Sequence, residues 1–302
     1  EPIGVQGKGI FAGSFDGQGH TISHLSMDRV TYGISDLDPT GLFGVTASSA
    51  RLQNLHLSQV DIRGGSYTGG LAGSFSGGMY HCSVTGRVEG FGNAGGLAGY
   101  AGTAELVDCH ADTDVTGASY VGGLCGSAAD GWYEACTASG TVTAVTDPRD
   151  PDVPPHVIGG LVGHQQGSAI RCCFADTTVR TQAASDLVGN LVGLSEYASI
   201  ARCYVSEDAG GAWDAVDDDY GGVTDVQALP WAEYDRLLAQ TIPADGSYEK
   251  QNGVFADQYN SKLPLTGAVD FDEDTLAVLI SHPTEEMVQH CQGRGFEAYG
   301  GG

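Results

Sequence analysis

The chain repeats the motif Gly-Gly-Leu-x-Gly at nearly regular intervals over the first two thirds of its length. The complete copies contain Leu71, Leu97, Leu124 and Leu161, a shortened copy precedes them at Leu42, and a degraded copy follows at Leu191. The spacings between these six leucines are 29, 26, 27, 37 and 30 residues. A recurring period of this size is typical of a repeat protein, in which each repeat adds one structural unit to a stack.

The glycine content of the repeats indicates whether the stacked units are helical or made of strands. Each repeat holds several glycines, and a glycine costs about 0.5–1 kcal/mol relative to alanine inside a helix. Residues 1–204 contain no apolar pattern of helical period, but short runs rich in Val, Leu, Ile, Thr and Tyr alternate with clusters of Gly, Ser and Asn. The repeats are therefore predicted to be strands joined by turns.

A second ladder of residues follows the leucines by 11 or 12 positions: Cys82, Cys109, Cys136, one of Cys172 or Cys173, and Cys203. Leu55 takes the same place in the first complete repeat. Two ladders with one offset predict a parallel β-helix of about seven coils, in which equivalent residues stack about 4.8 Å apart. Cysteine serves as a small buried hydrophobe there, and we expect free thiols because parallel side chains suit the disulfide dihedral poorly.

These motifs resemble the GLUG repeat family, whose members are typically bacterial surface or secreted proteins. The segment Ile10–Ile22 resembles the usual entry into such arrays, and the resemblance covers residues 1–204. It implies a right-handed β-helix, found in adhesin-like proteins and beside catalytic modules that include an IgA-cleaving metallopeptidase; related β-helices include polysaccharide lyases and glycoside hydrolases. Asn190, which replaces a motif glycine, and a proline-rich insertion at 146–156 depart from the pattern.

The sequence predicts two regions, the repeats at 1–204 and an acidic C-terminal cap with an appended segment at 205–302. Residues 230–240 form the clearest predicted helix, with Pro230 in its first turn, and 272–280 and 283–290 are shorter candidates. A helix is expected to cover the end of the solenoid, because an open β-helix exposes strand edges. The first and last residues suggest a mature or excised fragment.

The net charge of −25 limits the partners of the chain. Nucleic acid and anionic membranes are disfavoured, because both are bound through Lys and Arg. No run of 18 apolar residues is present, so we expect no membrane insertion. A host or cell-surface protein or glycan is the expected partner, with self-association as a further expectation.

Two groups of residues are candidate ligand or metal sites. Trp132 and Tyr133 at a corner, with Asp150 and Asp152 in the proline-rich insertion, are the predicted ligand-binding residues, because aromatic rings stack on sugars. Asp214, Asp217, Asp218 and Asp219 form a predicted metal site, and Ca²⁺ is the ion that such a group of hard oxygen ligands would take. No other cofactor is expected. In the alternative without a binding site, the aromatic side chains pack in the core and the acidic loops are exposed to solvent.

No catalytic arrangement is evident. The histidines do not form a His-Glu-x-x-His motif. Asp112 and Asp114 share one face of a strand, but the neighbouring repeats carry no acid there, and Asp176 aligns with Asp112 only two coils away. We therefore expect a non-catalytic stalk, adhesin or binding module that is extracellular or on a bacterial cell surface. The alternatives are a glycan-active β-helix enzyme and a self-assembling filament segment.

Overall fold

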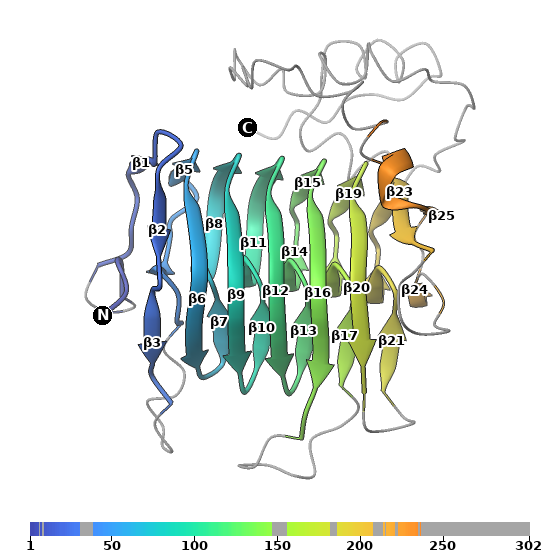
Figure 1. Cartoon of the computed structure of the whole chain (residues 1–302), viewed down its shortest axis with the longest axis horizontal. Coiled ribbons are helices and arrows are strands. Elements are labelled where there is room, and N and C mark those ends of the chain that lie inside the picture. The colour runs from blue at the N-terminus through green and yellow to red at the C-terminus, as the bar shows by residue number, and fades with distance from the viewer. Residues whose placement is uncertain are drawn as a thin grey trace. The chain divides into compact units, whose positions relative to one another are not determined.

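The computed structural model (Figure 1) describes residues 1–5, 7, 9–30, 39–146, 156–181, 186–207, 214, 216–220, 223–234 and 236. Of residues 217–220 and 223–224 only the backbone is described. The chain divides into two compact units, Glu1–Leu229 and Pro230–Gly302. The first unit is a β-solenoid of about six turns, one fewer than the repeats predicted, and its strands form one 20-stranded and one 5-stranded sheet.

Each coil contributes strands at four places, and each strand pairs in parallel with its equivalent in the next coil. The strands that precede the cysteine position belong to the first set: β1 (Ser14–Asp16), β5 (Arg51–Gln53), β15 (Trp132–Glu134), β19 (Ala169–Arg171) and the ends of β8 and β11. The strands that follow that position make up the second set: β2 (Thr21–Ser23), β3 (Ser26–Asp28), β6 (His56–Gly64), β9 (Ser83–Gly90), β12 (His110–Gly117), β16 (Thr137–Ala144) and β20 (Phe174–Arg180).

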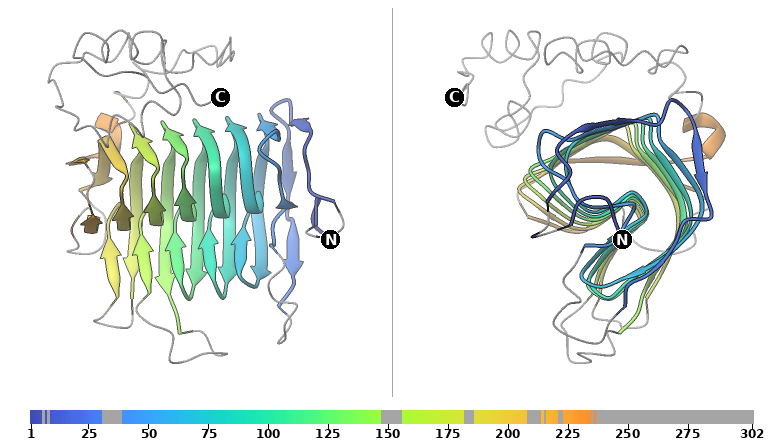
Figure 2. Two further views of the ribbon diagram at one scale, coloured as in Figure 1. Left: turned by 180° about the vertical axis from the view of Figure 1, so that it is seen from behind. Right: turned by 90° about the vertical axis from the view of Figure 1, so that its left-hand side faces the viewer.

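The other two sets flank the Gly-Gly-Leu motif. The short strands before it form the 5-stranded sheet: β7 (Tyr67–Gly69), β10 (Asn93–Gly95), β13 (Tyr120–Gly122), β17 (Val157–Gly159) and β21 (Leu187–Gly189). The strands after it are β4 (Phe43–Val45), β8 (Ala72–Tyr80), β11 (Ala98–Val107), β14 (Cys125–Ala129), β18 (Val162–Gln166) and β22 (Val192–Glu196). Seen along the solenoid axis, the coils superimpose and bend inward at one corner (Figure 2, right).

The predicted leucine and cysteine ladders lie in one continuous core. The five leucines from Leu71 to Leu191 are fully buried, and so is an inward column formed by Leu55, Cys82, Cys109, Cys136, Cys173 and Cys203. Cys173, not Cys172, is therefore the core member of the adjacent pair. All seven described cysteines are free thiols, as the sequence predicted, and Cys291 lies outside the described residues. The column thus contributes packing rather than cross-links.

Steric space explains the motif glycines. No glycine in the four complete motifs has a left-handed φ. A Cβ on Gly126 would lie 2.7 Å from the backbone nitrogen of Ala94 in the previous coil, and a Cβ on Gly70 would lie 2.6 Å from Cγ1 of Val84. Real Cβ atoms essentially never come within 3.0 Å of such neighbours. We call this inward bend the glycine corner, and its glycines let the strands on its two sides approach closely.

The solenoid continues beyond the last recognisable motif. Strand β24 (Val216–Tyr220) pairs with β22, and β25 (Val223–Leu229) pairs with β23 (Ser199–Ser206), both in parallel. The boundary between the two compact units falls after Leu229 rather than at the predicted residue 204. The proline-rich insertion connects β16 to β17, between strands that keep their register with the neighbouring coils, but residues 147–155 lie outside the described part.

In the second unit, residues 231–234 are helical within the predicted span 230–240. The predicted helices at 272–280 and 283–290 lie outside the described residues. Among the helical residues that the structure describes, none belongs to a helix long and apolar enough to cross a membrane.

Candidate functional site

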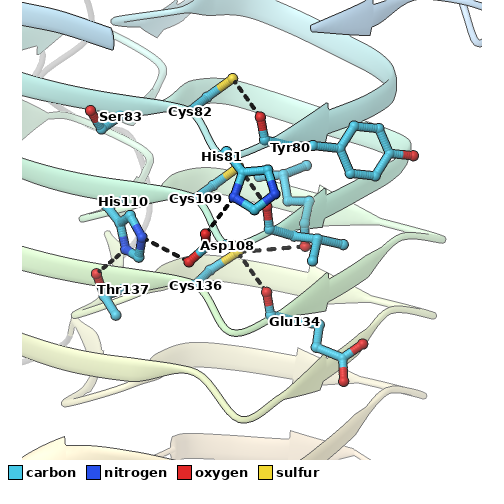
Figure 3. Close-up of polar contacts among 12 residues, drawn as sticks. Tyr80, His81, Cys82, Ser83, Asp108, Cys109, His110, Glu134, Cys136 and Thr137 are labelled. Carbon is cyan, nitrogen blue, oxygen red and sulfur yellow. Dashed lines mark hydrogen bonds and ion pairs between the residues drawn. The ribbon is translucent and has the colours of Figure 1, made fainter. Parts of the chain in front are cut away.

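A second corner of each coil carries a ladder of residues that includes half-buried histidine and aspartate side chains. The residue immediately before each member of the inward column has a φ of 50° to 53°, in the left-handed region: Asn54, His81, Asp108, Ala135, Cys172 and Arg202. Asn, Asp and His enter this region more readily than other residues with a Cβ. We call this ladder the left-handed corner. Figure 3 shows the part where histidine and aspartate occupy neighbouring coils.

Two imidazoles hold one carboxylate at this corner. His81 Nδ1 lies 2.6 Å from Asp108 Oδ2, and His110 Nε2 lies 3.0 Å from Asp108 Oδ1 (Figure 3). The side chains of His81 and Asp108 are each 17% exposed, and that of His110 is 40% exposed. The carboxylate therefore ties His81 of one coil to His110 of its own, and we call this group the His–Asp–His cluster.

The cluster shifts the pKa values of its members in opposite directions. Burial alone raises the pKa of Asp108, but the hydrogen bonds from His110 and His81, and their charges, outweigh burial and hold this pKa well below its usual range. Burial alone lowers the pKa of His110, but the hydrogen bond and the charge of Asp108 outweigh it and raise this pKa. The cluster thus favours an ionised Asp108 beside a charged His110.

A hydroxyl extends the cluster into the pattern that hydrolases use to activate a nucleophile. Thr137 Oγ1 lies 2.8 Å from His110 Nδ1, so hydroxyl, imidazole and carboxylate form a relay. Thr137 is only 7% exposed, however. The same strand position pairs His56 Nδ1 with Ser83 Oγ at 2.8 Å two coils earlier. The recurrence suits a polar ladder that joins coils better than a site for chemistry.

A second relay lies on the strands that follow the glycine corner. His164 Nε2 lies 2.8 Å from Glu196 Oε2, and His164 Nδ1 lies 3.5 Å from Ser127 Oγ. The ring of Tyr120 packs on the imidazole with centroids 4.9 Å apart. Ser127 is 5% exposed, and 3.5 Å is the limit for a hydrogen bond. Neither relay offers an accessible hydroxyl to a substrate.

The predicted aromatic corner is buried. Tyr133 is 0% exposed, packs in the core, and donates its hydroxyl to the carbonyl of Ala101 at 3.2 Å; burial raises its pKa well above the usual range. Trp132 is 5% exposed and donates Nε1–H to Glu134 at 3.1 Å. The predicted stacking of a ligand on Trp132 and Tyr133 requires exposed ring faces. Because both rings are buried, they do not offer such faces.

Trp132 also belongs to a buried ionic group. The guanidinium carbon of Arg171 lies 5.5 Å from the centre of the Trp132 ring, and Glu134 is 1% exposed. Burial raises the pKa of Glu134, although the charge of Arg171 and the Trp132 hydrogen bond oppose that rise. Register pairs Glu134 with Arg171 in adjacent coils. The arrangement joins coils, as the His–Asp–His cluster does.

The predicted acidic sites are only partly described. Asp214 is exposed, and its backbone carbonyl accepts the amide of Asn190. Asp217, Asp218 and Asp219 lie on strand β24, where only the backbone is described; Asp150 and Asp152 lie outside the described residues. Within the described part of the chain, no group of three or more His, Cys, Asp or Glu residues could hold a metal ion. Calcium binding at 214–219 stays a prediction.

The two carboxylates that the sequence analysis considered for catalysis lie where the predicted register places them. Asp112 and Asp114 are both exposed on β12, and Ser139 Oγ donates to Asp112 at 3.0 Å. Asp112 aligns with Ser139 and Ser139 with Asp176, so Asp176 lies two coils away.

The sequence reasoning missed the His–Asp–His cluster, although a signal for it was present. His81 and Asp108 directly precede Cys82 and Cys109, and His110 directly follows Cys109. Alignment on the cysteine column already places these residues in adjacent coils at one corner. What the column does not reveal is that the corner is left-handed, which turns the side chains toward one another.

The stacked parallel coils, with one buried column through all of them, define this chain as a β-solenoid repeat protein. No known family model matches it. The crystal structure of a "putative immunoglobulin A1 protease" from Bacteroides ovatus superimposes with a TM-score of 0.59 at 22% identity, over 77% of this chain and 75% of that one. At this identity the likeness shows the fold alone.

A sequence relative covers only part of the chain. Halomucin from Haloquadratum walsbyi is 42% identical over 96 residues, which are 32% of this chain and 1% of halomucin. The chain therefore spans a very small share of that protein.

Proposed function

We propose that the solenoid is a rigid, non-catalytic scaffold or binding module of a secreted or cell-surface protein, built from GLUG-type repeats. The observation that carries the proposal is the inward column, which continues from Leu55 to Cys203 as one buried residue per coil within a single hydrophobic core. Such a column makes each coil a platform for the next, and it stiffens the solenoid along its axis. The polar groups of the two relays join coils, and their hydroxyls on Thr137 and Ser127 are buried.

The similarity to halomucin supports an extracellular or surface location, and the acidic surface suits solubility outside a membrane. The experiment that tests location labels intact producing cells with an antibody against the solenoid. We expect labelling without permeabilisation, or recovery of the protein from the medium. Detection only after permeabilisation would contradict this part of the proposal.

The non-catalytic role is tested on the purified full chain. Immunoglobulin A1, a casein mixture, and neutral and acidic polysaccharides are the substrates, and we expect no turnover above a boiled control. Turnover that disappears in Asp108→Asn or His164→Asn would overturn the proposal.

A hydrolase is the second candidate, because two hydroxyl–imidazole–carboxylate relays are present and the structural neighbour is named after a protease. A fluorophosphonate probe distinguishes the two candidates. Labelling that is lost in Ser127→Ala or Thr137→Val would favour the hydrolase. Absence of labelling, with the buried hydroxyls as its reason, is the result we expect.

A further inference from the structure

The inward column contains an uninterrupted row of buried free thiols, one in each of five successive coils: Cys82, Cys109, Cys136, Cys173 and Cys203. Each of these side chains is 0% exposed. The thiol of Cys109 lies within hydrogen-bonding reach of those of Cys82 and Cys136, and the thiol of Cys173 within reach of those of Cys136 and Cys203. Each sulfur is therefore in contact with the sulfur of the next coil. We call these five residues the thiol row.

The thiol row ends at an apolar side chain on each side. Leu55 takes the column position in the coil before the row, and Val226 pairs in register with Cys203 in the coil after it. Burial raises the pKa of Cys109 and of Cys173 well above the ordinary value, so these thiols are protonated at neutral pH. Cysteine packs like a small hydrophobe, but its sulfur is also a ligand for soft metal ions, which an alanine or valine side chain is not.

The spacing of the coils matches an ion with two ligands. Equivalent residues in adjacent coils stack about 4.8 Å apart. A metal–thiolate bond is about 2.3 Å long, so two collinear bonds through one ion span about 4.6 Å. An ion can therefore bridge two adjacent sulfurs with little change in the spacing of the coils. Within the described residues no group of three or more His, Cys, Asp or Glu could hold a metal ion, so ions that need three or four protein ligands are not expected there.

The thiol protons can leave without orphaning a backbone carbonyl. Each thiol of the row donates to the carbonyl two residues earlier, as Cys109 does to Val107 at 3.4 Å. Each of these carbonyls also accepts a backbone amide from the preceding coil, as Val107 does from His81 at 3.1 Å. The carbonyls therefore keep a hydrogen bond when a metal ion displaces the thiol proton.

Charge balance favours a monovalent ion. The five thiols form four adjacent pairs, and four monovalent ions that displace four protons leave the row uncharged, with one proton still on a sulfur. Divalent ions in the same places would leave several uncompensated positive charges in a site that is closed to water, which is strongly unfavourable. Among monovalent ions, thiolate sulfur is a soft ligand that selects Cu(I).

We propose that the thiol row binds four Cu(I) ions, each of which bridges the sulfurs of two adjacent coils. Each site forms two copper–sulfur bonds; four S–H bonds break in the row as a whole, and their protons pass to the solvent. Copper and sulfur keep their oxidation states, so the binding needs no oxidant or reductant. Because the thiols are buried, the ions enter while the coils assemble. Copper would then link the coils through the core, a property that goes beyond the scaffold role and does not depend on it.

The test uses the full chain carrying Cys125→Ala, Cys172→Ala and Cys291→Ser, which removes the cysteines outside the thiol row. Alanine suits the first two positions, because Ala98 and Ala135 occupy them in neighbouring coils. The protein is refolded from urea without oxygen in an excess of Cu(I) supplied as its acetonitrile complex. A chelator then removes loosely bound copper, and elemental mass spectrometry measures the copper that remains. We expect four ions per chain.

Two single substitutions distinguish a row of bridges from thiols that bind copper independently. Cys136→Ala removes the middle sulfur and both bridges that it makes, so the bound copper should fall from four ions to two. Cys203→Ala is the matched control, because it removes a terminal sulfur and only one bridge, so the copper should fall to three ions. Independent thiols would lose the same amount of copper in both variants.

Two further measurements need no substitution within the thiol row, and they decide the matter if Cys136→Ala does not fold. X-ray absorption should find two sulfur ligands for each copper and no nitrogen or oxygen ligand. The copper-loaded protein should melt about 5 °C or more above the copper-free protein, because an ion that prefers the native row stabilises the fold. Zn²⁺ supplied in the same way should not raise the melting temperature.

The inference is overturned if no copper is retained, or if Cys136→Ala and Cys203→Ala lose equal amounts of it. It is equally overturned if copper has more than two ligands, if copper lowers the melting temperature, or if Zn²⁺ raises that temperature as much as copper does. None of these results bears on the scaffold role, which the turnover and cell-labelling experiments test separately.

Discussion

The glycine corner and the left-handed corner differ both in backbone conformation and in the residues that occupy them. The glycine corner repeats glycine in nearly every coil, yet its motif glycines have no left-handed φ. The left-handed corner has a φ near 50° in six coils and uses Asn, His, Asp, Ala, Cys and Arg there, but no glycine. Glycine in this protein therefore marks a lack of space inside the solenoid, while the left-handed corner accommodates a Cβ at all six positions, including the buried Ala135 and Cys172.

The coil at Asn190 supports this comparison. The preceding glycine at this position, Gly160, would place a Cβ against the backbone oxygen of Asn190 and against Thr177 Oγ1 in the strand β20. In the next coil the last register pair is Ala175 with Val205, so the position equivalent to Thr177 is residue 207, after β23 has ended. The side-chain crowding that Thr177 causes at Gly160 is therefore reduced at Asn190, although the backbone of the next coil still pairs there through the Asp214 carbonyl.

The largest expected effect comes from filling the glycine corner. Gly126→Ala places a Cβ 2.7 Å from the nitrogen of Ala94, in contact with backbone that cannot rotate away, and it should lower the free energy of unfolding by about 3 kcal/mol. Urea denaturation measures the change. Gly13→Ala is the matched control, because its Cβ would meet only the Phe11 ring at 3.5 Å and should change stability by less than about 0.5 kcal/mol. Equal effects of the two substitutions would contradict the role of space.

The second effect comes from the His–Asp–His cluster, where Asp108→Asn should cost about 2 kcal/mol near pH 5.5. The folded pKa of Asp108 is lowered, so its contribution is present above its unfolded pKa of about 4 and is lost as the pH falls through the folded pKa. The folded pKa of His110 is raised, so its contribution is complete below its unfolded pKa of about 6.5 and is lost as the pH rises through the folded pKa.

The two contributions therefore coincide between about pH 4 and pH 6.5. The stability difference between the unmodified chain and Asp108→Asn should be greatest there and should shrink toward pH 9. Thermal melts in a pH series measure it. Asp112→Asn is the control, since this carboxylate is exposed and accepts its hydrogen bond from the Ser139 hydroxyl. A difference that grows from pH 6 to pH 9 would refute the cluster's part in stability.

A third effect concerns the inward column, where Cys109→Ala should cost about 1.5 kcal/mol through lost burial and a small cavity. Burial raises the pKa of Cys109 well above its usual value and that of Cys172 to about 12. In a Cys291→Ser background, the native protein should thus react with Ellman's reagent only after unfolding. A reductant should leave its melting temperature unchanged; a fall in that temperature would reveal disulfides.

The smallest effect comes from relaxing the left-handed corner. Ala135 has a φ of 53°, which costs a residue with a Cβ about 1–2 kcal/mol, and glycine removes this cost at the expense of some burial and chain entropy. Ala135→Gly should raise the free energy of unfolding by roughly 0.5 kcal/mol. Urea denaturation of this variant and of Gly126→Ala measures both effects. Adding a glycine should stabilise the left-handed corner, whereas removing one should destabilise the glycine corner. Destabilisation by Ala135→Gly would show that conformation is not the cost at this corner.

The sequence by itself determined the period, the strand content and the register of the core. The residues equivalent to Leu71 and Cys82 recur with one offset because every coil must place the same apolar volume above the previous coil. Each repeat therefore carries the same pattern of core residues. The same rule predicted a core place for one of Cys172 and Cys173, and free thiols. It did not foresee β24 and β25, because backbone pairing with the previous coil extends the solenoid without a glycine motif.

Only the tertiary structure decided which outward side chains meet. His81 and Asp108 are 27 residues apart in sequence, and Tyr67 and Tyr100, whose ring centroids lie 5.8 Å apart, are 33 residues apart. Their contacts depend on the backbone angle at a corner and on the inward bend beside it, neither of which a single repeat encodes. The same geometry buried Trp132 and Tyr133, for which the sequence had left both ligand binding at a corner and core packing open. Core positions recur because every coil must fill the same interior space. Surface contacts form between side chains of different coils, so they are determined only when the coils stack.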